Sequence, residues 1–173
     1  MWCPVDKALY WVDIDGRAIH RYDHRSATTT SLSTADRPGS LATTNERGGF
    51  LAAMEASVWH LHWPTTTWRL VATLPTAALT RANDGCVDPA GRFVIGTMWG
   101  GAKPRPPIGS VCSVVDGEEP RTILTDLSVP NGITFDAERS RMYLSDTATQ
   151  LVWRWYYDRA SGTPSSPEVF FDF

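Results

Sequence analysis

The stretch RANDGCVDPAGRFVIGTM, residues 81–98, sets a run of polar residues directly against a short apolar segment. Asn83 and Asp84 supply side-chain oxygens, and Gly85 permits a backbone with positive φ, so the polar half is predicted to form a rigid loop. A hairpin turn with an Asx cap explains these residues as well as a ligand-binding loop does. The rest of the chain decides between the two interpretations.

The second half of this stretch predicts a turn followed by a strand. Residues 88–91, Asp-Pro-Ala-Gly, place Pro second and Gly fourth, as a β-turn prefers. Residues 93–98 then read as a strand. A glycine inside that strand, Gly96, indicates a close approach by another segment.

Similar short β-rich runs, separated by turn residues, fill the whole chain. Asp15-Gly16 lies between two of them and predicts a hairpin. No segment of helical length shows a sustained 3.6-residue period. The predicted strands are 8–14, 17–23, 28–32, 50–54, 57–62, 68–72, 92–98, 110–115, 121–124, 141–145, 151–157 and 168–171.

The predicted strands form four sets, which are internal repeats. The equivalent positions Tyr10, Leu51, Phe93 and Tyr143 stand 41, 42 and 50 residues apart, the last spacing being longer because residues 100–107 insert a Pro-rich loop. A period of about 40–50 residues with several short strands is typical of β-propeller blades. The sequence therefore predicts an all-β propeller with repeats at approximately 5–38, 39–78, 79–127 and 128–173.

Composition limits the classes of function and partner. The 173-residue chain has a net charge of -3 and a pI near 5.8, which gives no electrostatic case for nucleic acid. No apolar run approaches the roughly 20 residues that span a bilayer, and no signal peptide is visible. Three scattered cysteines form neither a disulfide framework nor a zinc motif. We therefore expect a cytoplasmic protein with no membrane or nucleic-acid partner.

The repeats also place the candidate site. Asn83 lies ten residues before Phe93 and Asn131 twelve before Tyr143, in the loop that leads into the inner strand of each repeat, and Asp146 ends the strand that contains Tyr143. Oxygens from adjacent blades that point at one axis would form a site for a hard cation. The alternative is that Asn131-Gly132 is only a turn and Asp146 only a strand-end cap.

Several short motifs strengthen the first interpretation. They are LYWVDI at 9–14, RANDG at 81–85, VDPAGR at 87–92, GTM at 96–98, PNG at 130–132 and SD at 145–146. In this combination and order the chain resembles the regucalcin/gluconolactonase family, also called the senescence marker protein lactonases. The resemblance implies a six-bladed propeller that hydrolyses sugar lactones and holds one divalent cation (calcium, zinc, manganese or magnesium) in its central channel.

The resemblance also implies roles for individual residues. Asn131 and Asp146 match direct metal ligands, and Asp146 also matches the general base. Asn83 matches a residue at the metal and the substrate, and Arg81 matches a substrate-binding arginine. A hard cation can polarise a lactone carbonyl, and a carboxylate beside it can accept a proton from water.

Two departures from the family pattern bear on activity. The family's third ligand is a glutamate that would fall three residues before Met1, and four repeats stand where the family has six. We therefore expect this chain alone to associate or to be poorly soluble, to bind metal weakly and to show little lactonase activity. A non-catalytic binding propeller, or an inactive remnant of the family, is the alternative function. Cys86 is expected to be a buried thiol.

Two further groups of side chains have both a functional and a structural interpretation. His60 and His62 share one face of a strand, but no third zinc ligand is evident near them in the sequence. Trp59, Trp63 and Trp68 suit packing between blades better than a sugar-stacking platform.

Overall fold

The computed structural model describes residues 1–75 and 78–173, which form β-strands and one short 3-10 turn, η1 (Trp63–Thr65). Within these residues no helix is long and apolar enough to span a bilayer. The strands are β1 (Trp2–Cys3), β2 (Ala8–Asp13), β3 (Ala18–Asp23), β4 (Thr28–Ser33), β5 (Pro38–Thr43), β6 (Gly49–Met54), β7 (Ser57–His62), β8 (Thr67–Thr73), β9 (Thr80–Val87), β10 (Phe93–Trp99), β11 (Gly109–Val114), β12 (Arg121–Leu127), β13 (Pro130–Asp136), β14 (Arg141–Asp146), β15 (Leu151–Asp158) and β16 (Thr163–Asp172).

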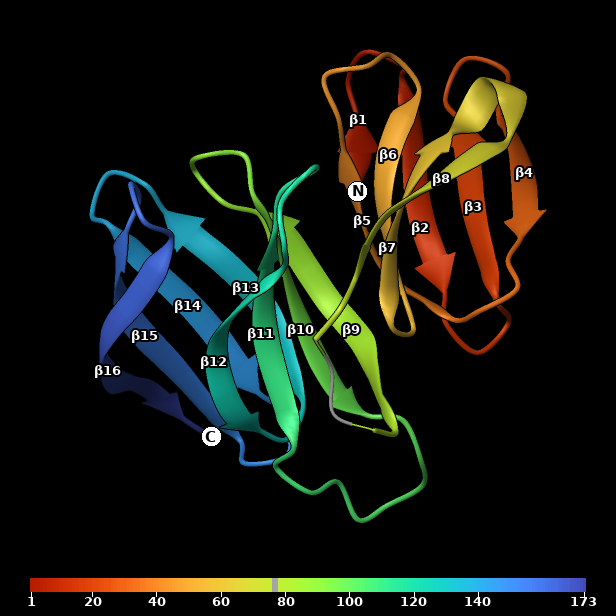
Figure 1. Ribbon diagram of the computed structural model, residues 1–173. Helices are drawn as coiled ribbons and strands as arrows, with labels where there is room; N and C mark the ends of the chain where they lie inside the picture. The colour runs from red at the N-terminus through yellow and green to blue at the C-terminus, as the bar shows by residue number, and fades with distance from the viewer. Residues whose placement is uncertain (76–77) are drawn as a thin grey trace.

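The strands form four antiparallel sheets of four strands each, β1–β4, β5–β8, β9–β12 and β13–β16, and each sheet follows the chain order. Figure 1 shows the β1–β4 sheet beside β5–β8, and the β9–β12 sheet beside β13–β16, with the first and last sheets at opposite ends of the row. The sheets therefore do not close into a ring. The all-β prediction is confirmed, and the architecture is that of propeller blades. A closed ring of six blades stays a prediction.

Apolar side chains fill the spaces between successive sheets. Strand β10 shows the rule, because Phe93 and Ile95 pack towards the second sheet while Val94 packs towards the fourth. Both faces of this strand are buried, which explains its almost uninterrupted apolar sequence. Between the first and second sheets, the rings of Tyr10 and Phe50 lie 4.4 Å apart.

The two predicted turns are confirmed, and one differs in detail. In the turn at 88–91, the Gly91 N–H donates to the Asp88 carbonyl at 3.0 Å, and Gly91 has φ of 92°. The hairpin at Asp15-Gly16 joins β2 to β3, but the residue with positive φ there is Arg17, at 50°.

The prediction of a loop at residues 81–85 is wrong, because they lie inside strand β9. The strand carries a bulge in which Asn83 and Asp84 together face Gly96 of β10. Gly85 does not have positive φ; it is needed because a Cβ there would lie 2.8 Å from the Val94 carbonyl oxygen. Asn131 and Gly132 likewise lie inside strand β13 and not in a loop. A second bulge follows Asn131 there, and Gly132 does have positive φ, at 59°.

The first strands of the second, third and fourth sheets are β5, β9 and β13, and they lie next to one another where the sheets meet. Strand β5 packs against β9, and β9 packs against β13. Sequence reasoning did not predict any of these three strands. Their neighbouring positions bring residues that are far apart in the chain, such as Asn83 and Pro130, into contact.

A buried carboxylate joins the third and fourth sheets. The Asp88 side chain accepts hydrogen bonds from Arg92 Nε and from the Tyr157 hydroxyl, both at 2.7 Å. Burial acts to raise the pKa of Asp88, but the hydrogen bonds from Tyr157 and Arg92 outweigh it and lower the pKa. This contact fixes β15 of the fourth sheet against the turn between β9 and β10.

Candidate functional site

A cavity of about 660 Å³ opens between the third and fourth sheets. Strand β9 contributes Arg81 and Asn83, and strand β13 contributes Asn131. Three of the four predicted site residues therefore line one cavity. The prediction that these residues converge is met for these three, while their chemical roles stay predictions.

Hydrogen bonds hold Asn83 between the two sheets. Arg81 Nη1 donates to Asn83 Oδ1 at 3.1 Å, and Asn83 Nδ2 donates to the Pro130 carbonyl at 3.1 Å. Arg81 Nη1 also donates to the Ala82 carbonyl at 2.8 Å. The bulge in β9 turns Asn83 towards the neighbouring sheet, and its amide is then fixed at both ends.

The fourth predicted residue, Asp146, lies beside the cavity and does not line it. Its residue is 3% exposed, and its two oxygens accept the N–H groups of Ser128 (2.9 Å) and Val129 (2.8 Å). Val129 and Thr147, which follows Asp146 in the chain, do line the cavity. Asp146 therefore holds the segment before β13 in place, a role that the sequence did not reveal.

Positive charge gathers at this cavity. Lys103 and Arg105, from the loop between β10 and β11, line it together with Arg81. Burial lowers the pKa of the Arg81 guanidinium, and the nearby guanidinium groups of Arg37 and Arg105 lower it further. Sequence reasoning noted the Pro-rich loop but missed its two basic residues, which were the signal available there.

The oxygen donors near the cavity fit a hard cation in their chemistry. Asn131 is exposed on the cavity side, and each Asp146 oxygen keeps a lone pair beyond the one that accepts a backbone N–H. Asn83 fits less well as a metal ligand, because its Oδ1 already accepts a hydrogen bond from the Arg81 guanidinium. In the part of the chain that the structure describes, no group of three or more His, Cys, Asp or Glu side chains is arranged to hold a metal ion.

The two histidines of β7 face a carboxylate that sequence reasoning missed. Glu46 Oε2 lies 3.3 Å from His60 Nε2, and Glu46 Oε1 lies 3.8 Å from His62 Nε2. Glu46 is 57% exposed at its side chain, so these contacts are surface ion pairs when the imidazoles are protonated.

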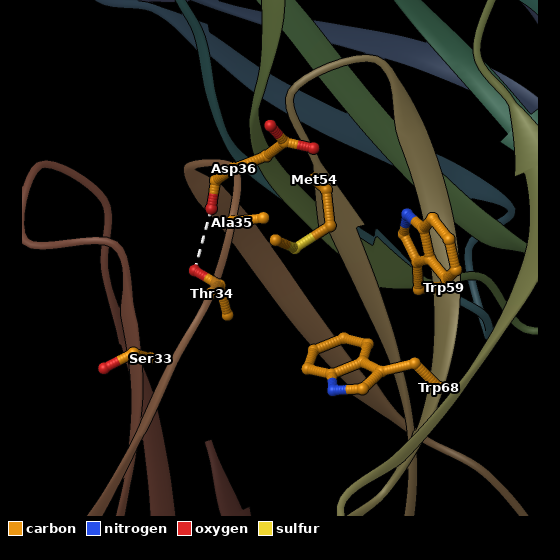
Figure 2. Close-up of a pocket in the computed structure, with 7 residues that line it drawn as sticks. All are labelled: Ser33, Thr34, Ala35, Asp36, Met54, Trp59 and Trp68. Carbon is orange, nitrogen blue, oxygen red and sulfur yellow. Dashed lines mark hydrogen bonds between the residues drawn. The ribbon is translucent and has the colours of Figure 1, made fainter.

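All three tryptophans pack against the core, and two of them also line a second, smaller cavity. Trp63 packs edge-on against Tyr10, with the ring centroids 5.4 Å apart. Trp59 and Trp68 also pack against the core of the first and second sheets. Both also line a pocket of about 230 Å³. Figure 2 shows them facing Met54 and the 33–36 segment, which begins with the last residue of β4.

Cys86 does not line the main cavity. Burial raises the pKa of its thiol to about 12, and the carboxylates of Asp84 and Asp88 add to the shift. The thiol is therefore protonated at neutral pH and is a packing residue. Cys3, Cys86 and Cys112 are all free.

Four-stranded antiparallel sheets packed face to face, with a polar cavity beside their first strands, place this chain in the broad class of β-propeller proteins. The chain belongs to the SMP-30/Gluconolactonase/LRE-like family, because the sequence model of that family matches residues 1–173. The family expected from the short motifs is thereby confirmed.

Two curated relatives are about one-third identical to this chain over the region that matches. The 6-deoxy-6-sulfogluconolactonase of Pseudomonas putida is 32% identical over 175 residues, covering 100% of this chain and 58% of the relative. The pentonolactonase of Haloferax volcanii is 32% identical over 179 residues, covering 98% and 56%. The chain thus spans little more than half the length of these relatives.

Solved structures share the fold. A calcium-binding protein, regucalcin, from Agrobacterium tumefaciens superposes with a TM-score of 0.90 at 28% identity, over 99% of this chain and 58% of that one. A luciferin-regenerating enzyme gives a TM-score of 0.91 at 22% identity, over 99% and 59%.

Proposed function

We propose that this chain forms part of a divalent-metal-dependent hydrolase of sugar lactones. The observation that carries the proposal is the arrangement of Arg81, Asn83 and Asn131 around one cavity, with the buried Asp146 carboxylate directly behind its wall. Relatives at 32% identity are named for lactones of a sulfogluconic acid and of a pentonic acid, which supports this class of substrate.

The chain's own residues would bind the lactone and move one proton. The Arg81 guanidinium and the Asn83 amide orient the substrate's hydroxyl and carbonyl oxygens. A water oxygen forms a bond to the lactone carbonyl carbon while a carboxylate oxygen of Asp146 accepts the proton. The ring carbon–oxygen bond then breaks, and Asp146 returns that proton to the departing ring oxygen. The product is an open-chain hydroxy acid, which releases its own proton to solvent at neutral pH.

Asn131 and Asp146 would hold the metal, which supplies polarisation of the lactone carbonyl and acidification of water. Both are hard oxygen donors, the type that calcium, magnesium and manganese prefer and that zinc accepts. Asn83 is better suited to the substrate, since Arg81 already occupies one side of its amide oxygen.

A titration of acid release from D-glucono-1,5-lactone tests the proposal. The rate above spontaneous hydrolysis is measured with calcium, zinc, manganese or magnesium added and then removed by a chelator. Asp146→Asn should lower any enzymatic rate by about 100-fold or more, as expected for loss of a general base. Asp13→Asn is the matched control, because Asp13 ends β2 as Asp146 ends β14 but accepts only the Gly16 N–H in an exposed turn. Full activity in Asp146→Asn would rule out the assigned base.

Calorimetric titration with the same cations separates metal binding from substrate use. Asn131→Ala should abolish cation binding, whereas Arg81→Ala should leave it intact and impair lactone turnover. An unchanged cation affinity in Asn131→Ala would remove that residue from the ligand set.

The second candidate function is binding of a small sugar-like ligand without catalysis. It is favoured by the engagement of both Asp146 oxygens with backbone N–H groups and by the missing cluster of charged metal ligands among the described residues. Ligand binding without acid release in the presence of every cation would support this alternative.

A further inference from the structure

The charged residues that line the main cavity are all basic. They are Arg81, Lys103 and Arg105, and no described Asp or Glu lines the cavity with them. The chain as a whole carries a net charge of -3, so the positive charge is local. A cleft lined by one sign of charge concentrates ligands of the opposite sign.

None of these three side chains forms an ion pair with a described carboxylate. Among the described residues, the Arg105 guanidinium donates only to the weak acceptor Met98 Sδ, at 3.6 Å, whereas Arg92 has the buried Asp88 carboxylate at 2.7 Å. Arg105 and Arg81 are close enough to act on one another. Asp15 and Glu55 act on Arg81 only without direct contact. Like charges that lack a direct ion-pair partner lower the cost of binding an anion between them.

The basic residues come from two separate segments. Arg81 belongs to β9 and contacts Asn83, so the proposed function uses it for the reacting part of the ligand. Lys103 and Arg105 belong to the loop between β10 and β11. A guanidinium presents a fork of N–H donors that matches an oxyanion, and an ammonium adds a compact charge. These two side chains are therefore available for a second group on the same ligand.

We propose that Lys103 and Arg105 select ligands whose sugar ring carries a tetrahedral oxyanion, a sulfonate, sulfate or phosphate group. The inference rests on the proposed function, because it assigns the substrate class of the same cavity. Arg81 and Asn83 hold the ring, and the loop cations hold the anion.

The test measures the binding of sugar analogues that contain no lactone bond and so cannot be hydrolysed. Calorimetry compares neutral 1,5-anhydro-D-glucitol with its 6-phosphate and its 6-sulfate, using the full chain. We expect the charged rings to bind about 10- to 100-fold more tightly, the range for one or two hydrogen bonds to a charged group. A gain for both rings supports a general oxyanion site, and a gain for one alone identifies the preferred group.

Variants connect this preference to the loop. In the double variant Lys103→Gln/Arg105→Gln the ratio of charged to neutral affinity should fall to within about threefold, since only screened long-range attraction remains. Arg25→Gln is the control, because Arg25 is an exposed basic residue in the loop between β3 and β4, outside the cavity. Equal affinities in the unaltered chain, or a ratio that persists in the double variant, would overturn the inference.

The binding test does not depend on turnover. A chain that prefers the charged rings but hydrolyses no lactone contradicts the proposed catalysis and leaves the anion site standing. A chain that hydrolyses gluconolactone but binds all three rings equally does the reverse.

Discussion

Replacing Asp146 by alanine should destabilise the fold itself, apart from any effect on catalysis. The carboxylate accepts the N–H groups of Ser128 and Val129, and both donor residues are buried, at 6% and 9% exposure. Each hydrogen bond to a charged acceptor contributes about 1.5–3 kcal/mol, and a truncated side chain leaves both N–H groups unpaired. Allowing for some access by water, we expect Asp146→Ala to lower the free energy of unfolding by about 2–5 kcal/mol.

Urea denaturation followed by tryptophan fluorescence measures this loss, without metal and with each cation. Asp146→Asn, which keeps one acceptor oxygen, should lose about half as much. Asp13→Ala should cost less than about 1 kcal/mol, because its single bond to the Gly16 N–H lies in an exposed turn. A stability of Asp146→Ala equal to that of the unaltered chain would show that the two N–H groups do not depend on this carboxylate. Any lost activity in Asp146→Ala should therefore be interpreted only after its stability is known.

Four further predictions concern other contacts in the fold. Tyr157→Phe removes a buried hydrogen bond to Asp88 and should lower the free energy of unfolding by about 1.5–3 kcal/mol in urea; an unchanged midpoint would contradict it. The pKa of Asp88 is lowered on folding, so its contribution is complete above pH 3.8 and is lost as the pH falls below it; Asp88→Asn should flatten the acid limb of the stability curve, and an unchanged limb would refute the assignment. Burial raises the pKa of Tyr10 to about 12, so its contribution is complete below pH 10 and declines towards pH 12; Tyr10→Phe should remove that part of the alkaline loss, and an identical alkaline limb would count against it. Gly96→Ala would place a Cβ 2.9 Å from the Pro130 ring and should cost about 1–3 kcal/mol by thermal melting; a neutral result would show that the ring can move away.

The second and third strands of each sheet could be predicted because their residues alternate or run apolar, as buried strands require. Strands β2, β3, β6, β7, β10, β11, β14 and β15 were all expected within a residue or two of their bounds. Of the four positions that mark the repeat, Tyr10 and Phe93 are fully buried, whereas Leu51 and Tyr143 are partly buried. The spacing of these positions carried the propeller prediction.

The central strands could not be predicted, because their sequences resemble turns. Strand β5 begins with Pro38-Gly39, and β9 contains Asn83-Asp84-Gly85. These residues lie at bulges, where an extra residue is accommodated and regular alternation is lost. Their strand conformation depends on pairing with the next strand and packing against neighbouring sheets, which local propensity does not report.

The candidate site, like the fold, could be predicted from the sequence only in part. The repeat placed Asn83 and Asn131 together because equivalent positions of adjacent blades share one end of the fold, and the shared cavity agrees with that. The position of Lys103 and Arg105 depends on how residues 100–107 fold back, and no periodic pattern encodes the path of such a loop. The structural contacts of Asp146 were missed because a carboxylate that accepts backbone N–H groups has no sequence signature of its own.

One short segment of β9 and the following turn, residues 83–88, reaches the fourth sheet three times. Asn83 donates to the Pro130 carbonyl, Asp84 Oδ2 accepts the Ile133 N–H at 3.1 Å, and Asp88 accepts from the Tyr157 hydroxyl. The cavity walls are thus tied through side chains on one strand, so local opening of that strand would release both walls together. The amide proton of Ile133 then becomes a natural reporter: its exchange with deuterated solvent should slow when a ligand occupies the cavity, and it should slow even if that ligand never touches β13.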